Sequence, residues 1–250
     1  MIEVKNVNKS FNGRQVLHDV SVKFESGKVN FIIGRSGSGK SVLTKCIVGL
    51  LEVDQGEILY DGRNFSAMNQ LDRKEIRKEI GMLFQGGALF DSMTVEENVG
   101  FPLKMFSYAS EKERKERVAF CLERVQLTGA EKRFPAEISG GMQKRVGIAR
   151  AIAMNPRYLF CDEPNSGLDP QTAIVIDNLI REITYEYNTT TVVVSHDMNS
   201  VIEIGDNINF VNEGTFWWSG NREEILRSSN QELNDFVYAS DFMKVIRKNL

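Results

Sequence analysis

The segment Gly34-Arg-Ser-Gly-Ser-Gly-Lys40-Ser41 decides how this chain folds. It fits the pattern G-x-x-x-x-G-K-[ST], with Gly34, Gly39, Lys40 and Ser41 at the fixed positions. The segment before it, Val29-Asn-Phe-Ile-Ile33, predicts a buried strand, and residues 42–48 after it predict a helix. Strand, loop and helix in that order are the context that the motif requires. The segment is therefore predicted to bind phosphate groups.

The chemistry of this loop follows from its residue types. Glycines let the backbone curl so that successive N–H groups face a phosphate, and the helix N-terminus adds its positive end. Lys40 is expected to reach the β- and γ-phosphates of a nucleotide, and the Ser41 hydroxyl is expected to ligate Mg²⁺. The residues predicted to bind nucleotide here are Gly34, Arg35, Ser36, Gly37, Ser38, Gly39, Lys40 and Ser41.

Length, charge and hydropathy exclude several classes of protein. The 250 residues suffice for one large domain or two small ones. A net charge of −3 and a pI of about 5.6 do not favour a nucleic-acid partner. The basic cluster 73–78 is interleaved with acids, so it predicts a solvated helix face. Cys46, Cys121 and Cys161 form no C-x-x-C pair and are predicted to be buried reduced thiols.

The apolar runs are too short for a membrane span. The longest are about five residues, against the roughly 20 that a helix needs to cross a bilayer. The N-terminus carries no apolar signal. We therefore expect a cytoplasmic chain whose membrane role, if any, depends on a partner.

Hydrophobic patterning predicts an α/β fold. The first thirty residues alternate like antiparallel strands, with Asn12-Gly13 as a tight turn. Another strand, 80–84, ends at Gln85. Strands and helices then alternate from 158 to 211, which predicts a parallel sheet covered on both faces. A helical insertion is expected between the strand ending at Gln85 and the strand ending at Asp162.

Two acids follow the predicted strand 158–161. Ligands of open α/β sheets bind at the carboxyl ends of the strands, where Asp162 and Glu163 would lie. Asp162 is placed to hold Mg²⁺, and Glu163, one residue further, is placed to act as general base on a water near the γ-phosphate. The alternative is an ordinary strand end with solvated acids, which would be preferred if the phosphate loop were absent.

A second helix N-terminus is suited to an anion. Ser139 is a capping residue type, and Gly140 and Gly141 after it admit close approach of an anion. The chain thus has two such helix starts but only one lysine loop. The alternative is a well-capped helix with a Gly-Gly entry.

These elements, taken in order, resemble the ABC-type ATPases over roughly residues 2–228. The residues that carry the resemblance are Phe11, Gly34–Ser41, Gln85, Ser139–Gln143, Asp162, Glu163, Ser166–Asp169 and His196. The resemblance implies a P-loop nucleotide-binding domain with an antiparallel β subdomain, an inserted helical subdomain at about 87–155, and ATP and Mg²⁺ as ligands. Residues 229–250 are then predicted to be a C-terminal helical extension.

The resemblance also implies roles for single residues. In that family the Ser-Gly-Gly element of one subunit closes over the nucleotide held by the other, which implies a homodimer. Phe11 is expected to stack on adenine. Gln85 is expected to contact Mg²⁺ and the attacking water, His196 to contact the γ-phosphate, and Asp169 to lie at the subunit interface. Ile138, where the family usually has leucine, and Cys161, often aliphatic, are mild departures.

Two local features resemble the Mla/Mce-type lipid-transport ATPases. These are the stretch from Phe84 to Pro102 after the predicted strand and Met142 after Ser-Gly-Gly. The resemblance implies transport of phospholipid or sterol-like lipid between bacterial membranes. It also implies a transmembrane permease, a Mce-type lipid-binding component, and a position on the inner face of the cell membrane.

Other functions remain open at this level. The chain could serve an importer of amino acids or other small solutes, since such ATPases share much of this core. A non-transport ABC protein is disfavoured because the chain has one cassette and no long coiled-coil insertion. A regulatory module without catalysis is disfavoured because Lys40, Glu163 and His196 are all present.

Overall fold

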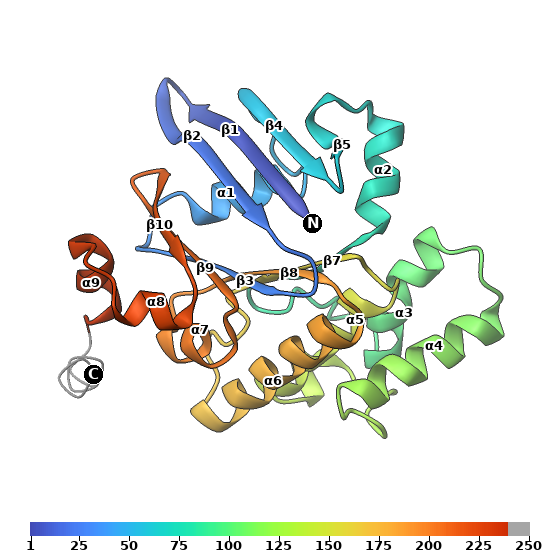
Figure 1. Cartoon of the computed structure of the whole chain (residues 1–250). Coiled ribbons are helices and arrows are strands. Elements are labelled where there is room, and N and C mark those ends of the chain that lie inside the picture. Colours follow the sequence, from blue (N-terminus) through green and yellow to red (C-terminus); the bar gives the residue numbers. More distant parts are fainter. Residues whose placement is uncertain (240–250) are drawn as a thin grey trace.

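The computed structural model describes residues 1–239, which form two β-sheets flanked by helices (Figure 1). The smaller sheet is antiparallel in the order β2-β1-β4-β5, and the larger runs β10-β9-β3-β8-β7-β6. The α/β prediction with an antiparallel part is confirmed. The strands are β1 Ile2–Phe11, β2 Arg14–Phe24, β3 Val29–Ile33, β4 Gln55–Tyr60, β5 Arg63–Asn64, β6 Ile80–Leu83, β7 Tyr158–Asp162, β8 Thr190–Val194, β9 Asn207–Asn212 and β10 Thr215–Gly220.

Helices cover the larger sheet, and two short helices come after its last strand in the sequence. Three of them, α3 to α5, fall within the segment predicted as a helical insertion, and Figure 1 shows α3 and α4 on one side of the molecule. In residues 1–239 no helix combines the length and apolar character that a membrane span requires. The helices are α1 Lys40–Ile47, α2 Gln70–Lys78, α3 Val95–Phe106, α4 Glu111–Arg124, α5 Gly140–Ile152, α6 Pro170–Glu186, α7 Met198–Ile204, α8 Arg222–Leu226 and α9 Gln231–Val237.

The C-terminal prediction is only partly covered by the structure. Within the predicted extension, 229–250, the structure describes one helix, α9. Residues 240–250 lie outside the described residues. The domain boundaries at 228 and at about 87–155 stay predictions.

Parallel pairing aligns the strands that matter for the site. Ile32 of β3 pairs with Val194 of β8, and Val194 pairs with Asp162 of β7. Leu83 of β6 pairs with Cys161 of β7. Because these strands run in the same direction, their carboxyl ends lie along one edge of the sheet.

The central strands are buried on both faces. Phe31 and Ile33 of β3 pack into the core shared with α5 and α6, whereas Ile32 packs into the core between the two sheets, with α1. Alternation along a strand sends neighbouring side chains to opposite faces, so a strand in the middle layer is mostly apolar. Four of the five residues 29–33 are apolar. The exception, Asn30, is buried, and its amide nitrogen donates to three backbone carbonyl oxygens at 2.9 to 3.0 Å.

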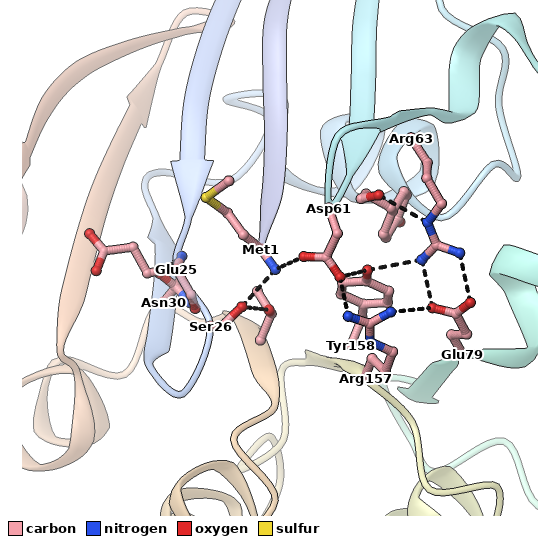
Figure 2. A network of polar contacts seen from close by, with 11 residues as sticks. Met1, Glu25, Ser26, Asn30, Asp61, Arg63, Glu79, Arg157 and Tyr158 are labelled. Atoms are coloured by element: carbon pink, nitrogen blue, oxygen red, sulfur yellow. Dashed lines mark hydrogen bonds and ion pairs between the residues drawn. The ribbon is translucent and has the colours of Figure 1, made fainter.

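A polar network joins the two sheets at the amino ends of β6 and β7 (Figure 2). The buried Tyr158 hydroxyl donates to Asp61 at 2.6 Å, and Arg63 donates to both carboxylate oxygens of Glu79 at 2.8 and 2.7 Å. Arg157 pairs with Asp61 at 2.7 Å. Burial raises the pKa of Tyr158 to about 12, so the residue acts as a neutral donor. The network therefore ties the antiparallel sheet to the parallel one.

One expectation from the sequence was wrong. Arg73, expected on a solvated helix face, is 6% exposed and donates to the carbonyl oxygens of Phe65 and Ser66 at 3.1 and 2.8 Å. It shares the inner face of α2 with Ile76, three residues on. The stem of an arginine can be buried when its head group finds carbonyl acceptors.

Tyr158→Phe tests the contribution of this network. The change removes the hydroxyl that bonds Asp61 and Arg63 without altering the ring packing. We expect the free energy of unfolding in urea to fall by about 1–2 kcal/mol. Tyr108→Phe, at a fully exposed tyrosine, is the control and should change little. Equal losses in both variants would contradict a stabilising role for the network.

Candidate active site

Four predicted segments meet at the carboxyl edge of the larger sheet. The loop 34–39 follows β3, Asp162 ends β7 with Glu163 next to it, His196 follows β8, and Gln85 lies two residues beyond β6. Since β3, β8, β7 and β6 are consecutive parallel neighbours, these segments lie side by side. The edge is where open α/β sheets bind their ligands.

The phosphate loop adopts a backbone that only glycine accepts easily. Gly34 has φ of +150°, and a Cβ there would lie 2.2 Å from the carbonyl oxygen of Val211. Gly39, immediately before α1, has φ of +106°. Any side chain at these positions would be strained, which explains why the motif fixes glycine at both.

Two side chains of the loop are directed inward. Lys40 is 9% exposed, and its Nζ donates to the carbonyl oxygens of Gly34 and Arg35 at 2.7 and 2.8 Å. Burial lowers its pKa, and the charges of Glu163 and Asp162 oppose that shift. The Ser38 hydroxyl is buried and has no hydrogen-bond partner within residues 1–239. An unpaired buried donor beside a lysine fits a phosphate oxygen as acceptor.

The two acids after β7 differ in environment. Asp162 ends the strand half-buried, and burial together with the charge of Glu163 raises its pKa. Glu163 has φ of +48°, a left-handed conformation that is unusual for a residue other than glycine. Its N–H donates to the Val194 carbonyl oxygen at 2.9 Å. The backbone thus turns sharply at Glu163, which sends the two carboxylates in different directions.

Glu163 contacts the predicted histidine. Its Oε1 lies 2.9 Å from Nδ1 of His196, and the side chains are 16% and 69% exposed respectively. Both residues line a cavity of about 570 Å³ that is also bordered by Ser166, Gly167 and residues of α9. The carboxylate is therefore shielded from bulk water while the imidazole faces it.

The second helix start belongs to a different part of the surface. Ser139 caps α5 by accepting from the Met142 N–H at 3.2 Å. The nearest groups to a side chain placed at Gly140 or Gly141 are Leu168 and Thr172, at the start of α6. The structure therefore does not bring Ser139–Gly141 together with the 34–41 loop of the same chain.

Gln85 and Phe11 lie at the periphery. Gln85 is exposed. The residues after it are held by hydrogen bonds from α5, where Arg150 donates to the carbonyl oxygens of Gly87 and Ala88 at 2.7 and 2.8 Å. Phe11 ends β1 with 39% of its surface exposed, as a ring that stacks on a ligand requires. The Lys9 ammonium lies 5.4 Å from the centre of this ring.

Sequence reasoning assigned no role to Lys144. This residue of α5 is 4% exposed, and its Nζ donates to the Glu163 carbonyl oxygen at 3.2 Å. It thereby links the helix that begins at Ser139 to the turn at Glu163. A signal was available, because Lys144 lies four residues before the buried Ile148 on one helix face. A charged residue on an apolar face needs a polar partner inside the protein.

Comparison with known proteins identifies the family. A family model described as ABC transporter matches residues 17–166, which is more than half of the chain. The chain belongs to the ABC transporter family. It is accordingly the ATP-binding, ATP-hydrolysing subunit of such a transporter.

Curated relatives within the family carry different cargo names. A methionine import ATP-binding protein of Clostridioides difficile is 40% identical over 95% of this chain and 74% of its own. A probable ribonucleotide transport ATP-binding protein of Mycobacterium leprae is 39% identical over 94% and 68%. An intermembrane phospholipid transport ATP-binding protein of Haemophilus influenzae is 37% identical over 95% and 90%. These identities do not separate the cargoes.

Solved structures share the fold. The ATP-binding cassette MJ0796, solved as a dimer bound to ADP and Pi, matches with a TM-score of 0.81 and 32% identity over 89% of this chain and 99% of that one. The protein cbiO1 of Clostridium perfringens, part of the transporter complex cbiONQ, matches with a TM-score of 0.85 and 27% identity over 100% and 98%. The expected ABC-type nucleotide-binding fold is confirmed.

Glu163→Gln tests the predicted general base. The amide keeps the shape of the side chain but cannot accept a proton, so ATP turnover should fall by about 10²–10⁴ while ATP binding persists. Turnover by phosphate release and affinity by calorimetry measure the two effects. Glu186→Gln, at an exposed glutamate of α6, is the control. Turnover near wild type in Glu163→Gln would remove Glu163 from this role.

Proposed function

We propose that this ATPase energises the movement of lipid, phospholipid or sterol-like, between bacterial membranes. Within this proposal the nucleotide is held by the 34–41 loop, Phe11 stacks on its adenine, and Glu163 is the general base. His196 contacts the γ-phosphate. The 2.9 Å contact between Glu163 and His196 at the edge of the phosphate loop's sheet supports this division of roles.

Mg²⁺ fits the oxygen donors at this edge. The Ser41 hydroxyl is exposed, and the Asp162 carboxylate is held where burial and Glu163 disfavour its charge. We propose that Ser41, Asp162 and Gln85 hold the ion together with the phosphates, since hard oxygen ligands suit Mg²⁺. The ion would neutralise charge that develops on the transferred phosphoryl group.

A second copy of the chain would complete the site. Ser139, Gly140 and Gly141 form a capped helix start suited to an anion, yet they pack beside Leu168 and Thr172 of their own chain. In a symmetric dimer this helix start would face the partner's phosphate loop. The dimeric MJ0796 cassette is consistent with such an arrangement.

Mixing two inactive variants tests the dimer. Chains carrying Ser139→Arg keep a working loop, and chains carrying Lys40→Ala keep a working helix start. A mixed dimer therefore holds one intact composite site, and an equal mixture should recover up to roughly a quarter of wild-type ATP turnover. Each variant alone should be nearly inactive. Full activity of Ser139→Arg alone would exclude a role in trans.

The partner in the membrane is proposed to bind beside Gln85. A cavity of about 280 Å³ is lined there by Phe84, Ala88, Phe90, Phe101 and Arg150, among others. Phe84 and Phe90 are 38% and 42% exposed. Partly exposed aromatic side chains are typical of interfaces. A permease bound here would hold the ATPase on the inner face of the membrane and could move Gln85.

The lipid cargo is supported by sequence at this same surface. Residues 86–92 and Met142 resemble lipid-type ATPases, and the phospholipid-transport relative aligns over 95% of the chain. Met142 packs against the core next to the start of α5. Met142 lies in the first turn of the helix that Ser139 caps. The Mce-type lipid-binding component belongs to this proposal.

Import of an amino acid is the second candidate. The methionine-import relative is 40% identical over 95% of the chain, as high as any relative described above. Such a system would use the same ATPase chemistry with a different permease. The composition of the complex distinguishes the two.

Purification of the chain from its native membrane in mild detergent tests the cargo. We expect a permease and a Mce-type component to accompany it, and bound lipid to appear by mass spectrometry. Its ATP turnover in nanodiscs should rise with phospholipid or sterol-like lipid supplied to the complex. The Glu163→Gln complex is the control for contaminating ATPases. A soluble amino-acid-binding partner, with activation by methionine, would instead establish the second candidate.

A further inference from the structure

A buried polar cluster joins the segments that follow β7 and β8, which also carry Glu163 and His196. It consists of Asp177 of α6, Asn165 of the loop after β7, and Ser200 of α7, which are 6%, 9% and 2% exposed. The Asn165 amide nitrogen donates to Asp177 Oδ1 and to Ser200 Oγ, both at 2.8 Å. The Ser200 side chain is also close enough to the Asp177 carboxylate to lower its pKa. Three separate elements are thus joined by side chains that are largely shielded from solvent.

The cluster spans the same two segments as the catalytic pair. Asn165 lies two residues after Glu163, and Ser200 lies four residues after His196. Asn165 also lines the cavity that Glu163 and His196 border. The two segments are therefore connected twice, once by the exposed 2.9 Å contact and once by the buried cluster. Only the buried connection is protected from competition by water.

Stability alone does not account for an acid at position 177. Burial raises the pKa of Asp177 to about 6, and Asn165 and Ser200 only partly oppose this. Because the pKa is higher folded than unfolded, the ionised carboxylate destabilises the fold at neutral pH, and this loss is relieved as pH falls below about 6. The other titratable groups that face it are Asp197 and Glu203 of the α7 segment and the Cys161 thiol of β7. The Asn165 oxygen has no partner within residues 1–239.

We propose that Asp177 is a positioning residue for ATP hydrolysis, which acts through Asn165 and Ser200 to fix the spacing between Glu163 and His196. Glu163 requires such support because its left-handed backbone conformation is unfavourable for a residue other than glycine unless neighbouring contacts stabilise it. The proposal rests on the catalytic roles proposed above for Glu163 and His196. Asp177 contacts neither of them directly and does not touch the nucleotide.

Two variants of Asp177 in the full-length chain separate positioning from folding. Asp177→Ala removes the acceptor, so kcat for ATP should fall by about tenfold to a hundredfold while KM changes less than about twofold. Asp177→Asn keeps an acceptor oxygen and removes the buried charge. It should keep kcat within about threefold of wild type with an equal or higher Tm at pH 8. Glu182→Gln, at an exposed position of the same helix, is the matched control.

The outcomes are distinct. Folded Asp177→Ala with wild-type kcat would overturn the proposal, as would a kcat loss in Asp177→Asn equal to that in Asp177→Ala. If Asp177→Ala does not fold at the assay temperature, Ser200→Ala removes the other end of the cluster. That variant should lower kcat by about threefold to tenfold, again with KM preserved, and wild-type kcat there would also overturn the proposal. Glu163→Gln in the same assay reports separately on the proposed base.

Discussion

The parallel pairing of β3, β8, β7 and β6 is the constraint on which the candidate site depends. Each strand is followed at its carboxyl end by one functional segment, and the register places these ends side by side. A shift of one residue in any pairing would exchange the side chains that face one core with those that face the other. Because both faces of the central strands are packed, the register is fixed by the cores and not by the site.

The turn at Glu163 depends on this pairing of the parallel strands. The residue adopts a left-handed backbone, which costs free energy unless neighbours hold it. Its N–H bonds β8, its carbonyl oxygen accepts from Lys144 of α5, and its carboxylate contacts His196 after β8. Three groups of one residue are thus held by two neighbouring elements. A movement of α5, or of the segment that carries His196, would therefore shift the position of the proposed base, Glu163.

Local patterns could be predicted from the sequence, and contacts between distant segments could not. The 29–33 strand was predicted with its observed limits, because a mostly apolar segment directly precedes the phosphate-loop motif there. Asn12-Gly13 was predicted as a turn because both residues tolerate positive φ. The spacing of Lys144 to Ile148 indicated its buried face, but its partner on the turn at Glu163 is far away in the sequence. Asp177 was not predicted because it is a single charged residue within an amphipathic helix, and the packing of α6 in the core shows that it is buried. Arg73 was misjudged for the same reason.

The cargo could not be predicted for a different physical reason. An ATPase of this family shares its nucleotide chemistry with relatives named for methionine, ribonucleotide and phospholipid transport. The residues that contact ATP are therefore uninformative about cargo, and any signal must lie where the permease is proposed to bind. The short stretch after Gln85 is such a place, and it is too short for composition or periodicity to specify a partner.

Charge is distributed differently at the two ends of the parallel sheet. At the amino end the network of Figure 2 pairs its charges, and the hydrogen bonds to Glu79 raise the pKa of Arg63. At the carboxyl end burial dominates: it lowers the pKa of Lys40 and Lys144 and raises that of Asp162. Titratable groups whose pKa is shifted away from its ordinary value are common at functional sites, because a ligand can supply the missing charge partner. One end of the sheet thus contributes stability, and the other carries perturbed charges that ATP and, under the proposal above, Mg²⁺ would balance.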